Sequence, residues 1–214
     1  MLDSIIFDLD GTLWDSCRVV AESWGETLRC RYQAQRWPSV EDVRSIMGMT
    51  AAGIAQRCFS DYGEQAMEVC LDCIARENAY IAVHSGDVYP GVEKMLRELY
   101  AKYPLFIVSN CQQGYIQSFF QATGLGIYFK DTECEGSSGL SKAENIRLIS
   151  KRNGLKAPLY VGDTAGDEKS ARAAGCPFIH AAYGFGKAEA ADGAINSPTE
   201  LLELIPSMEE NNNV

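Results

Sequence analysis

Two aspartates separated by one residue, Asp8 and Asp10, are the side chains best placed to do chemistry in this chain. They follow the bulky apolar residues 5–7, which predict a strand buried on both faces of a parallel sheet. Open α/β sheets bind ligands where such strands end. Close carboxylates repel each other unless a cation or a proton separates them, so the pair predicts a cation site or a catalytic site. The alternative is a strand-end turn in which Gly11 supplies a positive φ.

Five more polar side chains follow predicted strands or begin predicted helices farther along the chain: Ser109, Asn110, Lys142, Asp163 and Asp167. Each has an ordinary structural explanation, as a helix cap or as a solvated side chain. Taken together, they would require three separate strands to end in polar groups by chance. Because the carboxyl ends of parallel strands share one edge of a sheet, we expect these side chains to lie near the two aspartates.

The elements that must position these side chains alternate between strands and helices. Apolar runs predict strands at 105–108, 127–134, 159–161 and 177–179. The last of these is expected to be the final strand, and a last helix is expected before the polar tail 209–213. Ser141 and Glu144 have the form of a capping box that starts a helix. This alternation predicts an α/β fold with a doubly wound parallel sheet.

A helical insertion interrupts the alternation directly after the first strand. Residues 16–83 show helical spacing only, over a length too great for an ordinary loop. We therefore expect two domains: an α/β core of residues 1–15 and 85–214, and a small all-helical cap of residues 16–84. The linkers at 14–16 and 84–87 would lie side by side as a hinge, so the cap could open and close over the strand ends.

The longest helix of the insertion ends near Val83 and is expected to bury one apolar face. The members of this face are Met67, Leu71, Ile74 and Ile81. Cys70 and Cys73 lie in the same helix as a lone Cys-x-x-Cys pair. A structural zinc site needs four ligands and the sequence offers no second pair, so we expect these two cysteines to pack in the core.

Composition and charge narrow the possible partners. The chain has 214 residues, an apolar fraction of 46% and a net charge of −10. This charge argues against nonspecific binding of nucleic acids, and a phosphorylated substrate would need a local cation or a metal. No apolar segment is long enough to span a membrane, and the first strand starts too early for a signal peptide. We expect a cytoplasmic protein with reduced cysteines, no membrane or nucleic-acid partner, and a monomeric or weakly dimeric state.

The order and types of the polar residues resemble the four motifs of the haloacid dehalogenase superfamily, in particular its phosphatase branch. The motifs stand here as Asp8-Leu9-Asp10-Gly11-Thr12, Ser109, Lys142, and Gly162-Asp163-Thr164-Ala165-Gly166-Asp167. The first and fourth motifs are specific, whereas the second and third are weak alone. The insertion is similar to the C1-type cap of the phosphoglycolate-phosphatase-like and β-phosphoglucomutase-like members. The resemblance thus covers nearly the whole chain and implies a Rossmann-like core.

This resemblance implies a Mg²⁺-dependent phosphatase that hydrolyses a small phosphorylated metabolite through an aspartyl phosphate. Asp8 would attack phosphorus, and Lys142 would offset the remaining negative charge. Asp10 would protonate the leaving alkoxide and later deprotonate the attacking water. Mg²⁺ would be held by the carboxylates of Asp8 and Asp163, the backbone carbonyl of Asp10, and Asp167 as a further ligand or through water. The phosphoryl oxygens would be held by Gly11, Ser109 and Asn110.

Departures from related enzymes favour phosphate ester hydrolysis. Dehalogenases lack an aspartate at the position of Asp10, and phosphonate-cleaving relatives need a cap lysine, which residues 16–83 do not contain. β-Phosphoglucomutase-like enzymes carry a basic residue in the cap loop, where this chain has Ala51, although Arg44 or Arg57 could substitute. A hydrolase for a phosphoglycolate-like or sugar-phosphate-like ester is therefore the preferred function, with a phosphomutase as one alternative.

The cap would select the substrate, since the core motifs handle only the phosphate. Four residues of a cap loop are candidates for this selection, with cap packing as the alternative: Met47, Gly48, Met49 and Thr50. Cys111 follows the second motif and could be oxidation-sensitive, but an inert packed thiol is the favoured interpretation.

Two other classes of function stay open: a phosphate-responsive regulator without catalysis, and a nucleotide-dependent oxidoreductase, for which residues 184–186 offer only an isolated Gly-x-Gly.

Overall fold

The computed structural model of this chain describes residues 2–211. Its main sheet has six parallel strands in the order β5-β4-β1-β6-β7-β8, which confirms the predicted α/β class. The strands are β1 (Ser4–Phe7), β4 (Leu105–Ser109), β5 (Phe129–Cys134), β6 (Pro158–Gly162), β7 (Phe178–Ala181) and β8 (Gly193–Ile195). The prediction that the strand near 177–179 is the last one is wrong, because β8 follows it and pairs with β7 at the sheet edge.

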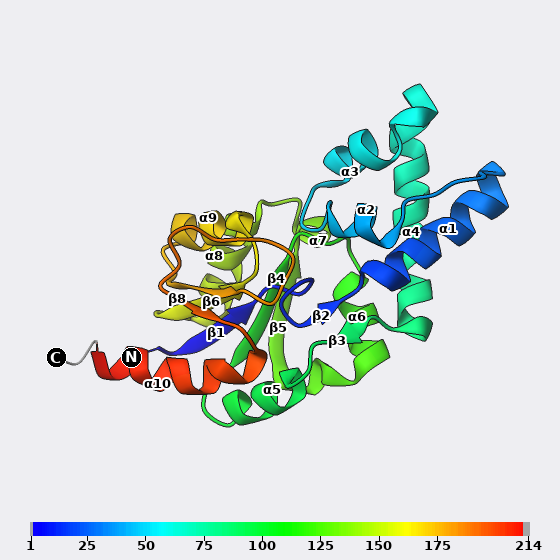
Figure 1. The fold of residues 1–214 in the computed structure, drawn as a ribbon. Helices are drawn as coiled ribbons and strands as arrows, with labels where there is room; N and C mark the ends of the chain where they lie inside the picture. The colour runs from blue at the N-terminus through cyan, green and yellow to red at the C-terminus, as the bar shows by residue number, and fades with distance from the viewer. Residues whose placement is uncertain (1, 212–214) are drawn as a thin grey trace.

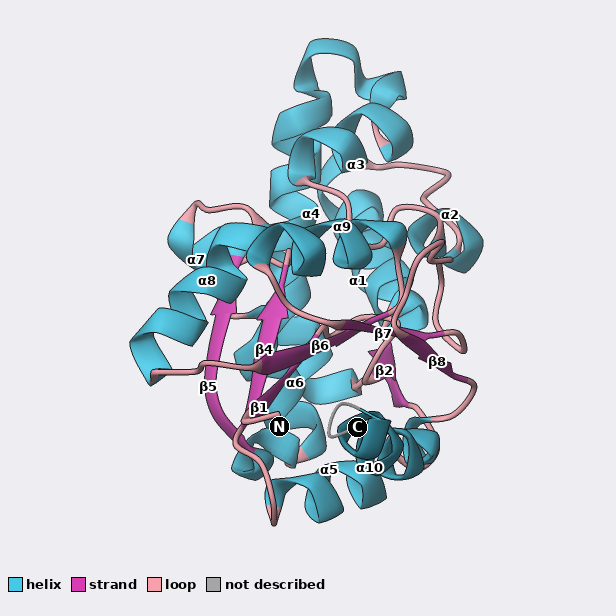
Figure 2. Ribbon diagram, turned by 90° about the vertical axis from the view of Figure 1, so that its left-hand side faces the viewer, coloured by secondary structure: helices cyan, strands magenta, loops and turns pink. Residues whose placement is uncertain are grey.

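Helices cover both faces of this sheet (Figures 1 and 2). One face carries α5 (Val92–Tyr100), α6 (Tyr115–Thr123) and α10 (Leu201–Asn211), and the other carries α8 (Lys142–Asn153) and α9 (Ala165–Ala174). Side chains alternate along β1, so Ile5 and Phe7 join the hydrophobic cluster of the first face and Ile6 joins that of the second. Burial on both faces explains why β1 is a continuous apolar run.

The cap forms from the segment between β1 and the next core helix, and it lies to one side of the sheet (Figure 1). Its elements are α1 (Cys17–Tyr32), α2 (Val40–Arg44), α3 (Ala51–Cys58), the 3₁₀ segment η1 (Ser60–Gln65) and α4 (Ala66–His84). Ser39 caps α2 and Thr50 caps α3, each through its side-chain oxygen. Trp24 of α1 packs against Phe59 at a ring-centroid distance of 5.5 Å and anchors the core of the cap.

The predicted buried face of α4 is partly wrong. Met67 and Leu71 are 40% and 50% exposed, whereas Val69 and Cys73 are fully buried. The helix packs on α1 and α3 and buries Val69, Cys70 and Cys73, whereas its Leu71 and Ile74 line a cavity. Periodicity found an apolar face but could not distinguish packing against protein from lining an open cavity. Cys70 and Cys73 are buried, as expected for core packing.

A two-stranded ribbon joins the cap to the core. It pairs β2 (Trp14–Asp15) with β3 (Asp87–Val88) in antiparallel orientation, so the two linkers lie side by side as predicted. The predicted polar tail 209–213 begins inside α10, and its residues 212–213 lie outside the described residues. Within residues 2–211, no helix combines the length and the apolar character needed to cross a membrane.

Candidate active site

The strand order places the polar strand ends beside one another. Strand β1 lies between β4 and β6, with Phe7 level with Ile107 on one side and Val161 on the other. Asp8 follows β1 directly, and its backbone N–H donates to the carbonyl of Val161. Ser109 ends β4 and Asp163 follows β6, so both flank Asp8 at the carboxyl edge of the sheet. This edge is the ligand-binding edge of open α/β sheets.

Lys142 supplies the positive charge of this edge. It is the first residue of α8, positioned by the capping box of Ser141 and Glu144 that the sequence predicts. Its ammonium lies 3.0 Å from Oδ1 of Asp8 and 2.5 Å from Oδ1 of Asp167, although the side chain is only 6% exposed. Burial alone would lower the pKa of Lys142, but the carboxylates of Asp167 and Asp8 raise it well above its usual value.

Asp8, Asp163 and Asp167 form a buried carboxylate cluster whose candidate ligand atoms all lie within 4.8 Å of one another. Oδ1 of Asp163 is buried and has no hydrogen-bond partner among the described residues. Burial first, and the charge of Asp167 second, raise the pKa of Asp163 to about 7. Burial and the neighbouring carboxylates likewise raise the pKa of Asp8 well above its usual value, against the opposing effect of Lys142. An orphaned carboxylate oxygen beside two others fits the hard oxygen ligation that Mg²⁺ requires.

Asp167 differs from its two neighbours because both of its oxygens are already engaged. Oδ1 accepts from Lys142, and Oδ2 accepts from the backbone N–H and the hydroxyl of Thr164 at 3.0 and 2.5 Å. Burial would raise its pKa, but Lys142 and Thr164 hold the pKa of Asp167 below its usual value. Thr164 and Asp167 thus form a capping box that starts α9 two residues earlier than predicted. A Thr-x-x-Asp spacing was the sequence signal for this arrangement.

Two glycines allow backbone to close over Asp163. Gly11 has a φ of +82°, and a Cβ there would lie 2.2 Å from Oδ2 of Asp163. Gly184 approaches equally closely, since a Cβ on it would lie 2.3 Å from the carbonyl oxygen of Gly11. The N–H of Phe185 donates to Oδ2 of Asp163 at 2.7 Å. The Gly-x-Gly at 184–186 therefore packs on the carboxylate cluster, a contact that the sequence reasoning missed.

Asp10 is held by three donors, none of which the sequence analysis assigned to the site. Its Oδ1 accepts from Nε1 of Trp14 at 3.0 Å, the hydroxyl of Ser16 at 2.6 Å and the hydroxyl of Tyr115 at 2.8 Å. Its Oδ2 accepts no hydrogen bond from a described residue. Burial raises the pKa of Asp10, and the three hydrogen bonds oppose that rise.

The loop after β4 lies at the carboxyl edge of the sheet and also contacts the cap. Ser109 is 4% exposed, and its hydroxyl accepts from the N–H of Cys111 at 3.3 Å. The side-chain amide of Asn110 donates to the carbonyl of Gly48 at 3.2 Å, which joins core and cap. Burial and the thiol of Cys134 raise the pKa of Cys111 well above its usual value. A protonated thiol is the less reactive form, which favours the inert interpretation of Cys111.

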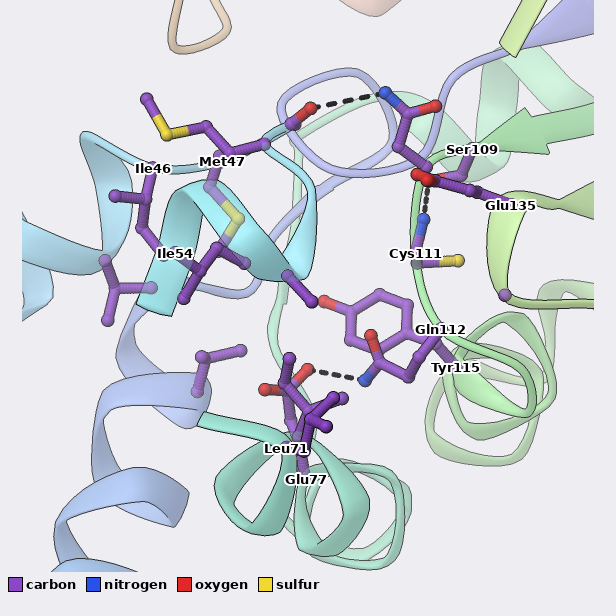
Figure 3. A pocket seen from close by; sticks show the side chains of 18 of the residues that line it. Ile46, Met47, Ile54, Leu71, Glu77, Ser109, Cys111, Gln112, Tyr115 and Glu135 are labelled. Carbon is purple, nitrogen blue, oxygen red and sulfur yellow. Dashed lines mark hydrogen bonds between the residues drawn. The ribbon is translucent and has the colours of Figure 1, made fainter. Parts of the chain in front are cut away.

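A cavity of about 370 Å³ lies between the cap and this edge of the core (Figure 3). Asp8, Ser109, Asn110 and Lys142 line its core side. Asp10, Asp163 and Asp167 are not among the lining residues, although Tyr115, which donates to Asp10, is. The cavity therefore opens onto Asp8 of the carboxylate cluster, whereas Asp163 and Asp167 do not line it.

The cap candidates fall in different places. Met47, Gly48 and Met49 line the cavity, whereas Thr50 caps α3 and does not line it; its neighbour Ala51 does. Arg44 pairs with Oδ2 of Asp15 at 2.9 Å, and Arg57 lines a separate hollow near Trp37. Neither arginine lines the cavity that Asp8 faces.

Comparison with known proteins shows the family to which this chain belongs. Residues 5–181 match the family model described as haloacid dehalogenase-like hydrolase. The chain is 29% identical over 194 residues to a phosphoglycolate phosphatase of Rhodobacter capsulatus, with 87% of each chain covered. It is 28% identical over 221 residues to a phosphoglycolate phosphatase of Vibrio parahaemolyticus, covering 94% of this chain and 95% of that one.

The fold has close counterparts among solved structures. A crystal structure described as a predicted phosphoglycolate phosphatase from Haemophilus somnus superposes with a TM-score of 0.81 at 23% identity. The superposition covers 95% of this chain and 98% of the other. At that identity the likeness speaks for the fold, including the helical insertion.

Proposed function

This chain belongs to the haloacid dehalogenase-like hydrolase family and is a phosphatase of that family, and on this premise we propose the reaction that its site performs. The reaction is Mg²⁺-dependent hydrolysis of a small phosphomonoester through a covalent phosphate on Asp8. One observation carries the proposal: Asp8 faces the cavity between a buried lysine and an orphaned carboxylate oxygen, that of Asp163. Attack by a carboxylate on a phosphate needs such flanking cations or cation ligands.

In the first step Asp8 acts as the nucleophile. Lys142 holds Oδ1, and no described residue hydrogen-bonds Oδ2, which is therefore available to attack. Oδ2 forms a bond to phosphorus while the bond from phosphorus to the alcohol oxygen breaks. The Ser109 hydroxyl and the backbone N–H groups beside it stabilise the charge on the phosphoryl oxygens.

A divalent cation would sit against Asp8 and Asp163, with the backbone carbonyl of Asp10 as a further ligand. Asp167 would contact it through water, because its own oxygens are taken by Lys142 and Thr164. When bound, Mg²⁺ supplies charge neutralisation between the attacking carboxylate and the phosphate.

Asp10 moves the proton in both steps. Its Oδ2 protonates the leaving alkoxide, and in the second step it takes a proton from the water that attacks the aspartyl phosphate and frees inorganic phosphate. Burial raises the pKa of Asp10, which favours its protonated form, and three donors fix the other oxygen. Asp10 does not line the cavity, so this role requires that it reach the leaving oxygen once substrate is bound.

The competing functions find less support in the site. A phosphomutase must hold a second phosphate, yet Arg44 of the cap pairs with Asp15 and Arg57 lines a separate hollow. A regulator without catalysis would not need the complete set of Asp8, Asp10 and Lys142 around a substrate-sized cavity. Cytoplasmic location and a monomeric or weakly dimeric state stay predictions.

Trapping the intermediate tests the proposal. The enzyme is mixed with p-nitrophenyl phosphate and Mg²⁺, quenched in acid within a turnover, and digested for mass spectrometry. We expect one phosphoryl group on the peptide that contains Asp8, and reversible loss of turnover when Mg²⁺ is chelated. Turnover without a phosphorylated peptide, or with the label on another residue, would contradict the proposed mechanism.

A further inference from the structure

The wall that the cap contributes to the cavity is apolar. It consists of Val20, Trp24, Val43, Ile46, Met47, Met49, Ala51, Ile54, Leu71 and Ile74, together with Gly48 and Glu77. Figure 3 shows the labelled members Ile46, Met47 and Ile54 on the cap side, facing Ser109 and Glu135 of the core. A cavity of about 370 Å³ lined this way is larger than a two-carbon glycolate group needs and favours a hydrocarbon body.

Glu77 of α4 is the single acidic side chain in this wall. It is 4% exposed, and each of its carboxylate oxygens accepts one hydrogen bond. Oε2 accepts from Nε1 of Trp24 at 2.6 Å, and Oε1 accepts from the side-chain amide of Gln112 at 2.8 Å (Figure 3). These two donors fix the carboxyl group at the cavity surface. Because each carboxylate oxygen has two lone pairs, both can still accept a hydrogen bond from a ligand.

Within residues 2–211, no positively charged side chain forms an ion pair with Glu77. Its two partners are neutral, and burial raises its pKa to about 7. Among the described residues that line the cavity, Lys142 is the one cation, and it is engaged by Asp8 and Asp167. Glu135 adds another acidic side chain to the lining. At a pH above about 7, where Glu77 is ionised, a second anionic group on the bound substrate would therefore meet repulsion in this cavity instead of a partner.

We propose that the substrate's alcohol part carries no negative charge, packs a hydrocarbon body against the cap wall, and donates a hydrogen bond from a hydroxyl or amino group to Glu77. This inference rests on the proposed phosphatase function and specifies its substrate class. It separates the chain from the two phosphoglycolate phosphatases it resembles, since glycolate ends in a carboxylate and Glu77 would oppose that group.

Matched phosphomonoesters test the proposal. 2-Phosphoglycolate, 2-hydroxyethyl phosphate and 2-aminoethyl phosphate differ in the group that would reach toward Glu77, and 4-hydroxybutyl phosphate extends the hydrocarbon body. p-Nitrophenyl phosphate with Mg²⁺ serves as the general phosphatase substrate. At about pH 8, where Glu77 is ionised, we expect kcat/KM for 2-hydroxyethyl phosphate to exceed that for 2-phosphoglycolate by about tenfold or more. The two added methylenes of 4-hydroxybutyl phosphate should raise kcat/KM by about another tenfold.

Two variants connect this preference to the cavity wall, and each is judged by the ratio of kcat/KM values within one enzyme. Glu77→Gln should lower the preference for 2-hydroxyethyl phosphate over 2-phosphoglycolate by about tenfold. Leu71→Lys, at a half-exposed position of the wall, adds a cation and should shift the ratio in the same direction. Glu64→Gln, on an exposed cap position outside the cavity, is the matched control and should leave the ratio unchanged.

The outcomes separate this inference from the function on which it rests. Hydrolysis of p-nitrophenyl phosphate with equal or better use of 2-phosphoglycolate would overturn the inference and leave the phosphatase function standing. An unchanged ratio in both Glu77→Gln and Leu71→Lys would overturn the role of the wall. Absence of hydrolysis of every ester, p-nitrophenyl phosphate included, would overturn the phosphatase function and this inference with it.

Discussion

The two sides of the cavity are built by opposite physical rules. On the core side, Lys142 lies between Asp8 and Asp167, and each carboxylate of the cluster has at least one charged or hydrogen-bonding partner, although the buried Oδ1 of Asp163 has none among the described residues. On the cap side the wall is apolar, with Glu77 as an acid that has only neutral partners. The core side is suited to binding one charged group of fixed geometry. The cap side is suited to recognising the shape of an apolar group and to forming a single hydrogen bond with the substrate. Under the proposed function, the core therefore supplies the chemistry and the cap selects the substrate.

The largest expected effect lies on the core side, at the nucleophile. Asp8→Asn removes the attacking carboxylate while keeping the volume of the side chain, so kcat should fall by about 10⁴-fold or more. Steady-state kinetics with p-nitrophenyl phosphate measures the loss, and circular dichroism checks the fold. Asp61→Asn, at an exposed cap position, is the control and should keep full activity. Near-normal turnover by Asp8→Asn would show that Asp8 is not the nucleophile, and it would contradict the assignment of the chemistry to the core side.

Lys142→Met tests whether the positive charge of Lys142 stabilises the carboxylates on the core side. Without the ammonium, the buried carboxylates of Asp8 and Asp167 repel each other unscreened. We expect kcat to fall by about 10²- to 10³-fold. The free energy of unfolding, measured in urea with a chelator present, should fall by about 3–5 kcal/mol. Lys130→Met removes an exposed lysine and should change neither value. Wild-type stability in Lys142→Met would show that this cluster is not balanced by the lysine.

The cap side predicts a pH effect of definite sign through Glu77. Burial raises its folded-state pKa from 4.5 to about 7, so between these values the folded protein binds a proton that the unfolded chain has lost. The contribution of Glu77 to stability therefore falls as pH rises through this window, by about 3 kcal/mol in total, and Glu77→Gln lacks this loss. Urea unfolding measures this effect: between about pH 5 and about pH 8, the free energy of unfolding of Glu77→Gln should rise relative to that of the parent by about 3 kcal/mol. A difference in the free energy of unfolding that does not change with pH would mean that Glu77 has an ordinary pKa in the wall. Glu64→Gln is the control, and its difference from the parent should not change with pH.

The smallest expected effect concerns the contact between the two sides. The hydroxyl of Tyr115, 2.8 Å from both Oδ1 of Asp10 and the hydroxyl of Ser16, is lost in Tyr115→Phe. One of three hydrogen bonds to Asp10 disappears, so kcat should fall by about fivefold to tenfold with little change in KM. Tyr100→Phe, on an exposed tyrosine, is the control. A change in KM alone would assign Tyr115 to the cap-side function of substrate binding.

The sequence was sufficient to predict the residues whose positions follow from strand ends. Asp8, Ser109 and Asp163 are brought together because the sheet is parallel and β1 is central. The capping box at Ser141 likewise placed the start of α8, and with it Lys142. These inferences succeed because local pattern and sheet topology determine the answer. The three-residue strand β8 was missed, since so short a segment has no readable period.

Contacts between distant segments could not be predicted. Tyr115 reaches Asp10 across a separation of 105 residues, and Gln112 reaches Glu77 across 35. Each partner alone resembles an ordinary helix or loop residue, and only the packing of distant segments against each other gives it a polar role. The apolar face of α4 was misassigned for a related reason, because a cavity wall and a packed face share one pattern.

The ribbon that joins cap and core also limits how the domains can be recombined. Trp14 and Ser16, on either side of Asp15, both donate to Asp10, so the connecting segment positions the residue that we propose as the acid and base. A chimera that joins a relative's cap at the boundary between Asp15 and Ser16 would take Trp14 from one protein and Ser16 from the other, although both donate to Asp10. A functional graft must leave 14–16 with the recipient core and place its N-terminal seam inside α1. Exchange of substrate preference between relatives is then a matter of the helices beyond that seam.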